Sequence, residues 1–286
     1  MNIRPRRSAL YLPASNPRAL EKARTLPCDV VILDLEDAVA PDAKALARAQ
    51  AVDAVRAGGF GARELVVRVN GLETPWGADD LRALAGAAPD AVLVPKVSDG
   101  GDIAAYQAFL SETPETVRLW AMIETTRSLF RLDGIARMSA DTRLSAFVLG
   151  TNDLAKEMGA TLTTARLPFV GALGLAVAAA RAYGLAILDG VFNALEDEAG
   201  LAEQCRQGVE FGFDGKTLIH PRQIEPCNAA FSPSAEAIRW AQTILAAFDL
   251  PENADKGAIR VEGRMVERLH LVAARRTLAI RDTVAR

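Results

Sequence analysis

Residues 118–159 read RLWAMIETTRSLFRLDGIARMSADTRLSAFVLGTNDLAKEMG. Two apolar runs within this stretch, Leu119–Ile123 and Leu144–Leu149, are each too short for a helix and are typical of buried strands. A polar, helix-like interval separates them. An acidic residue follows each run, Glu124 after the first and Asp153 after the second. The stretch therefore predicts two successive parallel strands with a carboxylate beyond each.

These two carboxylates are candidate ligands for a metal ion. Parallel strands would place Glu124 and Asp153 at the same end of the sheet. Mg²⁺ takes oxygen ligands and is usually held by only one or two carboxylates. The alternative is that Asp153 caps a helix and Glu124 is a surface acid. The two residues alone leave both interpretations open.

The bulk composition narrows the class of protein. A chain of 286 residues, half of them apolar, can form one large α/β barrel or two ordinary domains. The net charge of −3, with both signs interspersed, predicts binding to neither nucleic acid nor an anionic membrane. The N-terminal apolar stretch is too short for a signal peptide, and the longest apolar region is too short for a membrane span. Three scattered cysteines fit a reducing compartment, so we expect a soluble, cytoplasmic protein.

The alternation of apolar run, polar break and amphipathic helix extends along most of the chain. It indicates parallel strands with helical crossovers, and eight such units predict a (β/α)₈ TIM barrel. An open, doubly wound sheet is less favoured because no GxGxxG follows the first strand. The expected strands are Ser8–Leu12, Val30–Leu35, Glu64–Val69, Ala91–Pro95, Leu119–Ile123, Leu144–Leu149, Leu185–Leu188 and Gly215–Ile219. The expected helices include Pro17–Thr25, Pro41–Arg56, Ala78–Ala85, Ile103–Ser111, Phe169–Tyr183 and Glu196–Gly208.

Polar residues follow nearly every expected strand, although the strand interiors are apolar. In a barrel these strand ends form one face, which is where active sites lie. A solvated loop would explain one or two such residues but explains a ring of them poorly. The residues are Glu36, Asp37, Arg68, Asn70, Lys96, Glu124, Asp153, Asp189, Lys216 and His220.

The chain after the barrel is expected to form a C-terminal helical extension. We place the barrel core at residues 1–231 and the extension at 232–286. Within the extension, Ser234–Phe248 is typical of a closing helix and Pro251–Gly257 of a turn-rich hinge. The remaining tail has helical spacing only in part.

Seven ordered blocks of sequence resemble the citrate lyase beta-subunit-like family, which includes the malyl-CoA and citramalyl-CoA lyases. A single LEDAV or IHP would be weak, but the seven blocks cover almost the whole chain. The blocks are RSALYLPASNPRALEKA, VILDLEDAVAPDAKALAR, VRVNGLETPWGADDL, LVPKV, AMIET, VLGTNDLAKEMG and GFDGKTLIHPRQIEPCNAAFSPS. The resemblance implies a Mg²⁺-dependent (β/α)₈ barrel, a homotrimer or homohexamer, that cleaves or forms a carbon–carbon bond beta to a CoA thioester.

The resemblance also implies roles for individual residues. Glu124 and Asp153 would ligate Mg²⁺, and Arg68 would face the reacting carbonyl. A guanidinium suits an enolate oxygen because it stays charged and donates in a fork. Glu36 and Asp37 would support the metal-bound water. The alternative for Arg68 is an ion pair with Glu36, which can coexist with the catalytic role.

Further residues would bind the substrate. Arg18 and Lys22 fall where the family commonly contacts the CoA nucleotide. Backbone amides of the Gly150, Thr151 and Asn152 turn could hold the carboxylate of a 2-oxo acid at a helix N-terminus. Ile219, His220 and Pro221 would shape the CoA channel, although His220 could instead be a general base. Lys96 is either a substrate cation or a surface lysine, Asp189 either supports the site floor or caps the next segment, and His270 is expected at the surface.

The tail carries one departure from the family pattern. In CoA lyases of this family, a motif resembling G-x-M-[IV]-D supplies an Asp that closes over a neighbouring subunit's site as an acid/base. Here Glu267 stands where that Asp is expected. The extension would then be a lid on a neighbouring subunit, but a misplacement of about an ångström can cost on the order of a hundredfold in rate. The alternative is that Glu267 is a solvated helix acid.

The leading expectation is a Mg²⁺-dependent carbon–carbon lyase. It would cleave or form malyl-CoA or citramalyl-CoA, with acetyl-CoA and glyoxylate or pyruvate as the products of cleavage, through a thioester enolate. Three alternatives stay open: a citrate lyase beta subunit acting on an acyl-carrier-protein thioester, a malyl-CoA thioesterase in which the same site directs water at the ester, and a catalytically impaired acyl-CoA-binding protein.

Overall fold

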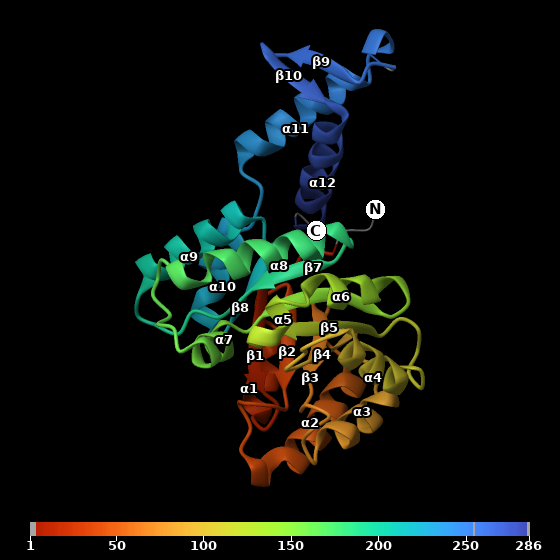
Figure 1. The fold of residues 1–286 in the computed structure, drawn as a ribbon, viewed down its shortest axis with the longest axis vertical. Helices are drawn as coiled ribbons and strands as arrows, with labels where there is room; N and C mark the ends of the chain where they lie inside the picture. The colour runs from red at the N-terminus through yellow and green to blue at the C-terminus, as the bar shows by residue number, and fades with distance from the viewer. Residues whose placement is uncertain (1–3, 254, 285–286) are drawn as a thin grey trace. The chain divides into compact units, whose positions relative to one another are not determined.

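A computed structural model describes residues 4–253 and 255–284, which belong to two compact units (Figure 1). The larger unit spans Arg6–Ala230, and the smaller contains the chain from Phe231 onward together with Arg4 and Pro5. No helix in the described part is both long enough and apolar enough to cross a membrane.

The larger unit is a closed barrel of eight parallel strands in sequential order, with helices around it (Figure 1). This confirms the predicted (β/α)₈ barrel. Strand β1 pairs with β2 on one side and with β8 on the other, which closes the sheet. The strands are β1 (Ser8–Pro13), β2 (Val30–Asp34), β3 (Glu64–Arg68), β4 (Ala91–Val94), β5 (Arg118–Ile123), β6 (Leu144–Leu149), β7 (Ala186–Asp189) and β8 (Gly215–Leu218).

Helices follow the strands as crossovers, and several end where the sequence supplies a left-handed glycine. Gly159 after α7 has φ of 61° and Gly212 after α9 has φ of 93°, a conformation that favours glycine at a helix C-terminus. The helices are α1 (Pro17–Ala23), α2 (Lys44–Ala57), α3 (Gly77–Ala85), α4 (Gly100–Leu110), α5 (Thr126–Leu129), α6 (Leu132–Arg137), α7 (Thr151–Met158), α8 (Val170–Ala182), α9 (Glu198–Phe211) and α10 (Ile224–Ala230). Short 3₁₀ turns lie at Pro41–Ala43, Met138–Ala140, Leu167–Phe169, Pro221–Gln223 and Pro251–Asn253.

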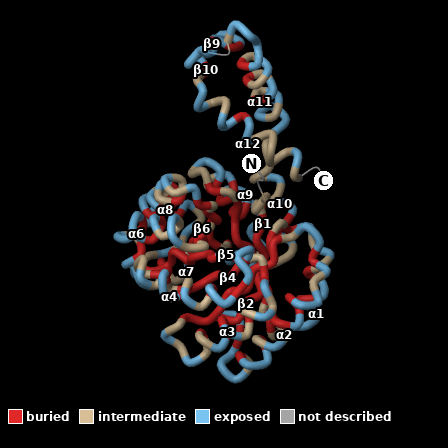
Figure 2. The backbone as a smooth tube through the Cα atoms, turned by 90° about the vertical axis from the view of Figure 1, so that its right-hand side faces the viewer, coloured by how far each residue is buried: buried red, intermediate tan, exposed pale blue. Residues whose placement is uncertain are grey.

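Buried residues concentrate on the barrel strands (Figure 2). Successive side chains on a strand alternate between the interior and the surrounding helices. Asp34 lies two residues beyond the buried Ile32, and Arg68 two residues beyond Val66, so both share the interior face of their strands. The apolar interior consists of Ala9, Val30, Ile32, Val66, Ala91, Leu93, Trp120, Met122, Ala146, Val148 and Leu188.

The smaller unit contains a β-hairpin that the sequence did not lead us to expect. Helix α11 (Ala235–Phe248) is followed by antiparallel strands β9 (Ala258–Val261) and β10 (Arg264–Glu267), and then by helix α12 (Arg268–Val284). The two turn residues, Glu262 and Gly263, both have positive φ, as tight hairpins require. Each strand has only four residues, too few for its alternation to stand out. The hairpin's apolar face forms a small core with α11 and α12, built from Ala241, Ile244, Phe248, Ile259, Val261, Val266 and Ala274.

Candidate active site at the C-terminal ends of the strands

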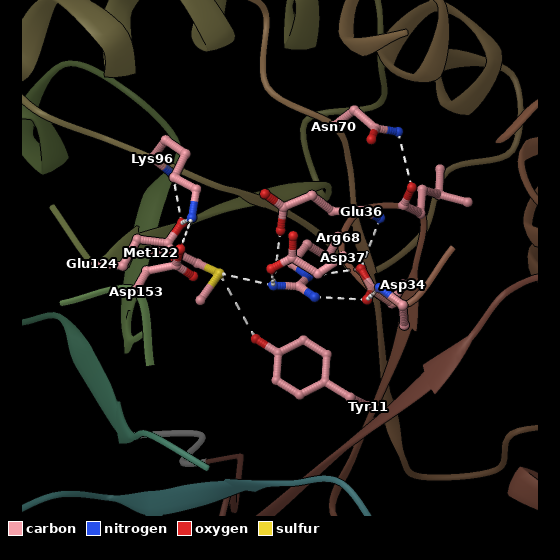
Figure 3. A network of polar contacts seen from close by, with 12 residues as sticks. Tyr11, Asp34, Glu36, Asp37, Arg68, Asn70, Lys96, Met122, Glu124 and Asp153 are labelled. Carbon is pink, nitrogen blue, oxygen red and sulfur yellow. Dashed lines mark hydrogen bonds and ion pairs between the residues drawn. The ribbon is translucent and has the colours of Figure 1, made fainter. Parts of the chain in front are cut away.

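Arg68, the last residue of β3, is the centre of a buried charge cluster (Figure 3). Its Nε and Nη2 donate to the two carboxylate oxygens of Asp34 at 2.7 and 2.6 Å. Its Nη1 lies 2.8 Å from Glu36 Oε2. The Tyr11 ring lies 4.8 Å from the guanidinium carbon, at cation–π distance. We call Arg68, Asp34 and Glu36 the Arg68 cluster.

Asp34 is a residue that the sequence analysis missed. It is fully buried, and besides binding Arg68 it accepts the backbone N–H groups of Glu36 and Ala38 at 2.9 and 3.0 Å. It therefore fixes both the guanidinium and the turn after β2. The available signal was an acid inside the apolar run VILDL, in phase with the interior position Ile32.

The two acids after β2 have different surroundings. Burial raises the pKa of Glu36 to about 8, although the charge of Arg68 acts to lower it. Asp37 has a largely exposed side chain, and its carboxylate lies 3.8 Å from Arg68 Nη1. Buried Lys44, another residue that the sequence analysis missed, donates from Nζ to the carbonyls of Leu35 and Glu36 at 2.8 and 2.7 Å. The turn is thus held so that Glu36, rather than Asp37, packs against the guanidinium.

Glu124 and Asp153 meet at a shared cation, the side chain of Lys96 (Figure 3). Lys96 Nζ lies 2.7 Å from Asp153 Oδ1 and 3.5 Å from Glu124 Oε1. Glu124 is fully buried, so it is no surface acid. Asp153 is the third residue of α7, and the N-cap position belongs to Gly150, so Asp153 is no N-cap. Burial acts to lower the pKa of Lys96, but Glu124 and Asp153 outweigh it and raise that pKa.

The oxygen atoms at this point fit a hard divalent cation. Glu124 Oε2 is buried, and it accepts no hydrogen bond from any residue that the structure describes. Burial raises the pKa of Glu124 despite the nearby Lys96, so a bound cation would stabilise its charged form. No three His, Cys, Asp or Glu side chains form a metal cluster within residues 4–253 and 255–284. Two carboxylates without further protein acids are typical of Mg²⁺ rather than of zinc.

The turn after β6 brings backbone close to this pair. A Cβ atom at Gly150 would lie 2.4 Å from Glu124 Cβ, so any larger residue would displace the carboxylate. Thr151 is buried, and the Asn152 amide is paired with Asn193, which donates to it at 2.7 Å. The N–H groups of a helix's first turn lack intrahelical partners, and at the start of α7 they can meet an anion.

The segments expected to contact CoA lie on neighbouring strands. Arg18 and Lys22 are exposed, one turn apart on α1, which follows β1. Ile219, His220 and Pro221 follow β8, and β8 pairs with β1. The closed barrel therefore brings together two segments about two hundred residues apart in sequence. His220 Nδ1 accepts the N–H of Arg222 at 3.1 Å, so this nitrogen caps its own turn.

Several predicted residues make no contact with the Arg68 cluster or with the Lys96 bridge among the described hydrogen bonds and ion pairs. Asp189 and Lys216 form an ion pair at 3.0 Å that contacts α9 on the outside of the barrel through Gln204, so the predicted support of the site floor by Asp189 is wrong. Asn70 Nδ2 donates to the Leu35 carbonyl and to Asp80.

The smaller unit holds Glu267, the last residue of β10, and half-buried His270, which accepts the Glu267 N–H at 3.0 Å. The interpretation of Glu267 as a helix acid is therefore wrong.

Comparison with protein families then identifies the chain. Residues 7–221 match the model of the HpcH/HpaI aldolase/citrate lyase family. The chain belongs to this family. The match covers the whole barrel except its last helix, and it confirms the resemblance seen in the seven sequence blocks.

Individual relatives correct the expected reaction. The chain is 46–48% identical over 281 residues to (3S)-malyl-CoA thioesterases of Cereibacter sphaeroides, which covers 98% of this chain and 96% of each relative. An L-malyl-CoA/beta-methylmalyl-CoA lyase of the same species is 34% identical, covering 92% of this chain and 91% of the relative. The lyase expectation is therefore wrong, and its thioesterase alternative is the better supported one. The chain thus belongs to a family of enzymes whose named activities differ.

A solved structure supports the fold across both units. The protein CitE of Mycobacterium tuberculosis, in complex with magnesium, acetoacetate and coenzyme A, is 32% identical and superposes with a TM-score of 0.74. The superposition covers 96% of this chain and 97% of CitE.

Proposed function

We propose that this chain is a Mg²⁺-dependent thioesterase that hydrolyses (3S)-malyl-CoA to malate and CoA. The observation that carries the reaction is the 46–48% identity, over 98% of the chain, to relatives of that name. The geometry supports it because a buried guanidinium and a pair of carboxylates suited to a divalent cation lie at the same end of one barrel.

Arg68 would stabilise the charge that hydrolysis creates. Water adds to the thioester carbonyl carbon, negative charge develops on the carbonyl oxygen, and the C–S bond then breaks. Asp34 holds Nε and Nη2, so the guanidinium is oriented before substrate arrives. A preoriented cation needs no reorganisation in the transition state. An enolate would place its charge on the same oxygen, which explains why the sequence pattern favoured a lyase.

Glu36 would accept the proton of the attacking water. A pKa of about 8 keeps a useful fraction of its carboxylate ionised near neutral pH while making it more basic than an ordinary glutamate. The proton can then pass to the sulfur of CoA as the tetrahedral intermediate collapses. Asp37, which is largely exposed, would contribute negative charge at the edge of this site.

Glu124 and Asp153 would hold Mg²⁺. When bound, the ion would supply a fixed positive charge for the oxygens of the malyl group. Glu124 Oε2, which is buried and accepts no hydrogen bond from a described residue, supports this assignment, as does the magnesium in the CitE complex.

The remaining binding residues follow from the same face. Gly150, Thr151 and Asn152 would hold the free carboxylate of the malyl group through backbone amides at the start of α7. Arg18 and Lys22 would bind the CoA phosphates, and the loop of Ile219, His220 and Pro221 would line the CoA channel.

The smaller unit would be the lid of a neighbouring subunit in a homotrimer or homohexamer. Hydrolysis leaves the carbon–carbon bond intact, so it needs no acid on the acetyl carbon. The presence of Glu267 where the lyases have Asp is therefore compatible with a thioesterase.

A single assay distinguishes hydrolysis from carbon–carbon cleavage. Purified protein is mixed with (3S)-malyl-CoA and Mg²⁺, and free thiol and glyoxylate are measured in parallel. We expect one thiol per substrate consumed and no glyoxylate, with activity lost in chelator and restored by Mg²⁺. Stoichiometric glyoxylate without thiol would contradict the proposal.

A carboxylate variant tests the metal assignment in the same assay. Glu124→Gln should lower turnover by roughly a thousandfold, because the neutral amide can no longer neutralise the cation. Glu115→Gln, at an exposed position before β5, is the matched control and should keep normal turnover. Normal Mg²⁺-dependent turnover in Glu124→Gln would show that the metal lies elsewhere.

A further inference from the structure

Lys96 holds a strained backbone conformation at the mouth of the barrel. It lies two residues after β4 and has φ of 54°, in the left-handed region that side-chain-bearing residues rarely adopt. This conformation is accompanied by a hydrogen bond from the Lys96 N–H to Glu124 Oε1 at 2.8 Å. A strained backbone conformation persists only where contacts with the surrounding structure hold it in place, and such conformations cluster at functional sites.

The side chain of Lys96 bridges both carboxylates that would hold the metal. Nζ lies 2.7 Å from Asp153 Oδ1 and 3.5 Å from Glu124 Oε1, and only 32% of the side chain is exposed. A surface lysine would instead extend its ammonium into water. Lys96 thus contacts Glu124 twice, through its backbone N–H and through its ammonium group.

We propose that Lys96 is a tethered cation that holds Glu124 and Asp153 in place and that a divalent cation displaces when it binds. The ammonium and the metal ion would compete for the same oxygens. The lysine stem has four flexible carbons, so the ammonium can leave while the N–H bond to Glu124 stays. Lys96 therefore sets the affinity of the site for metal. This inference rests on the metal site of the proposed function.

Metal binding to substrate-free protein tests the competition without any turnover. Mn²⁺ and Mg²⁺ are titrated calorimetrically into wild type, Lys96→Met and Lys156→Met. Methionine keeps the length of the stem but carries no charge. The control Lys156 is exposed on α7, one turn after Asp153, and no ion pair involves it in the part of the chain that the structure describes.

Lys96→Met should bind Mn²⁺ about tenfold more tightly than wild type. An apparent dissociation constant rises by the inverse of the competent fraction, so removing a competitor that occupies about nine-tenths of the sites gives this factor. Lys156→Met should stay within about twofold of wild type, because screened charges beyond the site contribute little. Unchanged or weaker binding in Lys96→Met would overturn the inference.

A second measurement uses the wild-type protein alone. The rate at which an amine-reactive acetyl ester labels Lys96 is followed by peptide mass spectrometry. Saturating Mg²⁺ should accelerate labelling of Lys96 severalfold and leave Lys156 unchanged, because displacement frees the ammonium from its carboxylates. Equal labelling of Lys96 with and without Mg²⁺ would refute displacement.

The outcomes separate this inference from the proposed function. Tighter Mn²⁺ binding in Lys96→Met together with no hydrolysis of malyl-CoA would refute only the thioesterase. Metal binding by wild type without any gain in the variant would refute only the role of Lys96. Absence of metal binding in every form would overturn both the metal assignment and the inference.

Discussion

Two buried charge clusters at the strand ends of this barrel differ in composition and in position. In the Arg68 cluster, one guanidinium faces two carboxylates, Asp34 and Glu36. In the second, which we call the Lys216 cluster, Lys216 and Arg166 share the single carboxylate of Asp189. The first has surplus negative charge once Glu36, whose pKa is about 8, is ionised, whereas the second has surplus positive charge.

The Lys216 cluster is held by several hydrogen bonds, although Arg166 Nη2 is buried and has no hydrogen-bond partner among the described residues. Lys216 Nζ donates to Asp189, to the Gly190 carbonyl and to Gln204, at 3.0, 2.5 and 3.2 Å. Arg166 Nη1 donates to Asp189 at 2.6 Å. Burial acts to raise the pKa of Asp189, but Lys216 and Arg166 outweigh it and hold the pKa below its usual range. The carboxylate is therefore ionised at neutral pH, and the cluster joins β7 and β8 to α9 and to the segment before the 3₁₀ turn at Leu167–Phe169.

The difference follows from the face of the strand on which each cluster lies. Arg68 and Asp34 are in phase with the interior residues Val66 and Ile32, so they meet at the mouth of the barrel. Asp189 follows the interior residue Leu188 and therefore points outward. An ion pair on the inner face is available to a ligand, whereas one on the outer face is covered by helices. A position at a strand end therefore does not by itself identify a catalytic residue.

The largest expected effect is the loss of stability in Asp189→Asn. The change leaves two buried cations without a counter-charge and should lower the free energy of unfolding by about 3–5 kcal/mol. Urea denaturation measures it, and turnover of the still-folded variant should stay normal. Asp133→Asn, in an exposed ion pair with Arg137, is the control and should show no comparable loss. A stable Asp189→Asn variant with impaired turnover would reverse the roles of the two clusters.

The pH dependence of stability tests the structural role of the Asp189 carboxylate. Because the pKa of Asp189 is depressed in the folded state, its contribution is present above the pKa of an unfolded aspartate. That contribution is lost as the pH falls through the folded pKa. The stability difference between wild type and Asp189→Asn should therefore be full at neutral pH and shrink in acid. A constant difference would contradict the assignment.

Arg68→Lys should give the next largest effect, in turnover rather than stability. Lysine cannot reproduce the fork that binds both oxygens of Asp34, so kcat/KM should fall about a hundredfold, equivalent to about 2.7 kcal/mol. Steady-state release of thiol measures it. Arg166→Lys is the matched change in the Lys216 cluster and should leave kcat/KM nearly unchanged while lowering stability. Similar values of kcat/KM for Arg68→Lys and Arg166→Lys would show that the two clusters do not differ in their contribution to turnover.

Asp34→Asn should have a smaller effect on turnover. In the proposed function Asp34 acts only by orienting Arg68, so kcat should fall about tenfold with little change in KM. The unfolding midpoint is measured alongside, because a general loss of structure would also lower the apparent kcat at unchanged KM but would shift that midpoint. A change confined to KM would show that the guanidinium serves in binding rather than in the transition state.

The Arg68 cluster can also be tested by the slope of stability against pH. Burial raises the pKa of Glu36 from 4.5 to about 8 in the folded protein. Ionising this group therefore costs stability, and in chelating buffer the free energy of unfolding should decline as the pH rises from 4.5 to about 8. Glu36→Gln should flatten that part of the curve. An identical slope in the variant would show that Glu36 is not the titrating group.

The sequence predicted the positions of the strands well. Every expected strand lies within one residue of the observed one, because short apolar runs bounded by polar breaks are strong signals of buried parallel strands. It also placed Arg68, Glu124 and Asp153 at the barrel mouth. It did not predict the β9–β10 hairpin, whose stability depends on packing against α11 and α12. Nor did the family pattern give the reaction, since the family supports more than one chemistry on the thioester.

What the sequence determined by itself was the alternation of strand and helix, and with it the barrel and the end at which the acids lie. Only the tertiary structure decided which of those residues meet. The register between β2 and β3 places Asp34 beside Arg68. The register between β7 and β8 places Asp189 beside Lys216, and the alternation of side chains along these strands directs both outward. The bridge from Lys96 to Glu124 and Asp153 spans three consecutive strand ends. Local pattern cannot encode such pairings because they depend on the stagger between strands, which exists only once the barrel has closed.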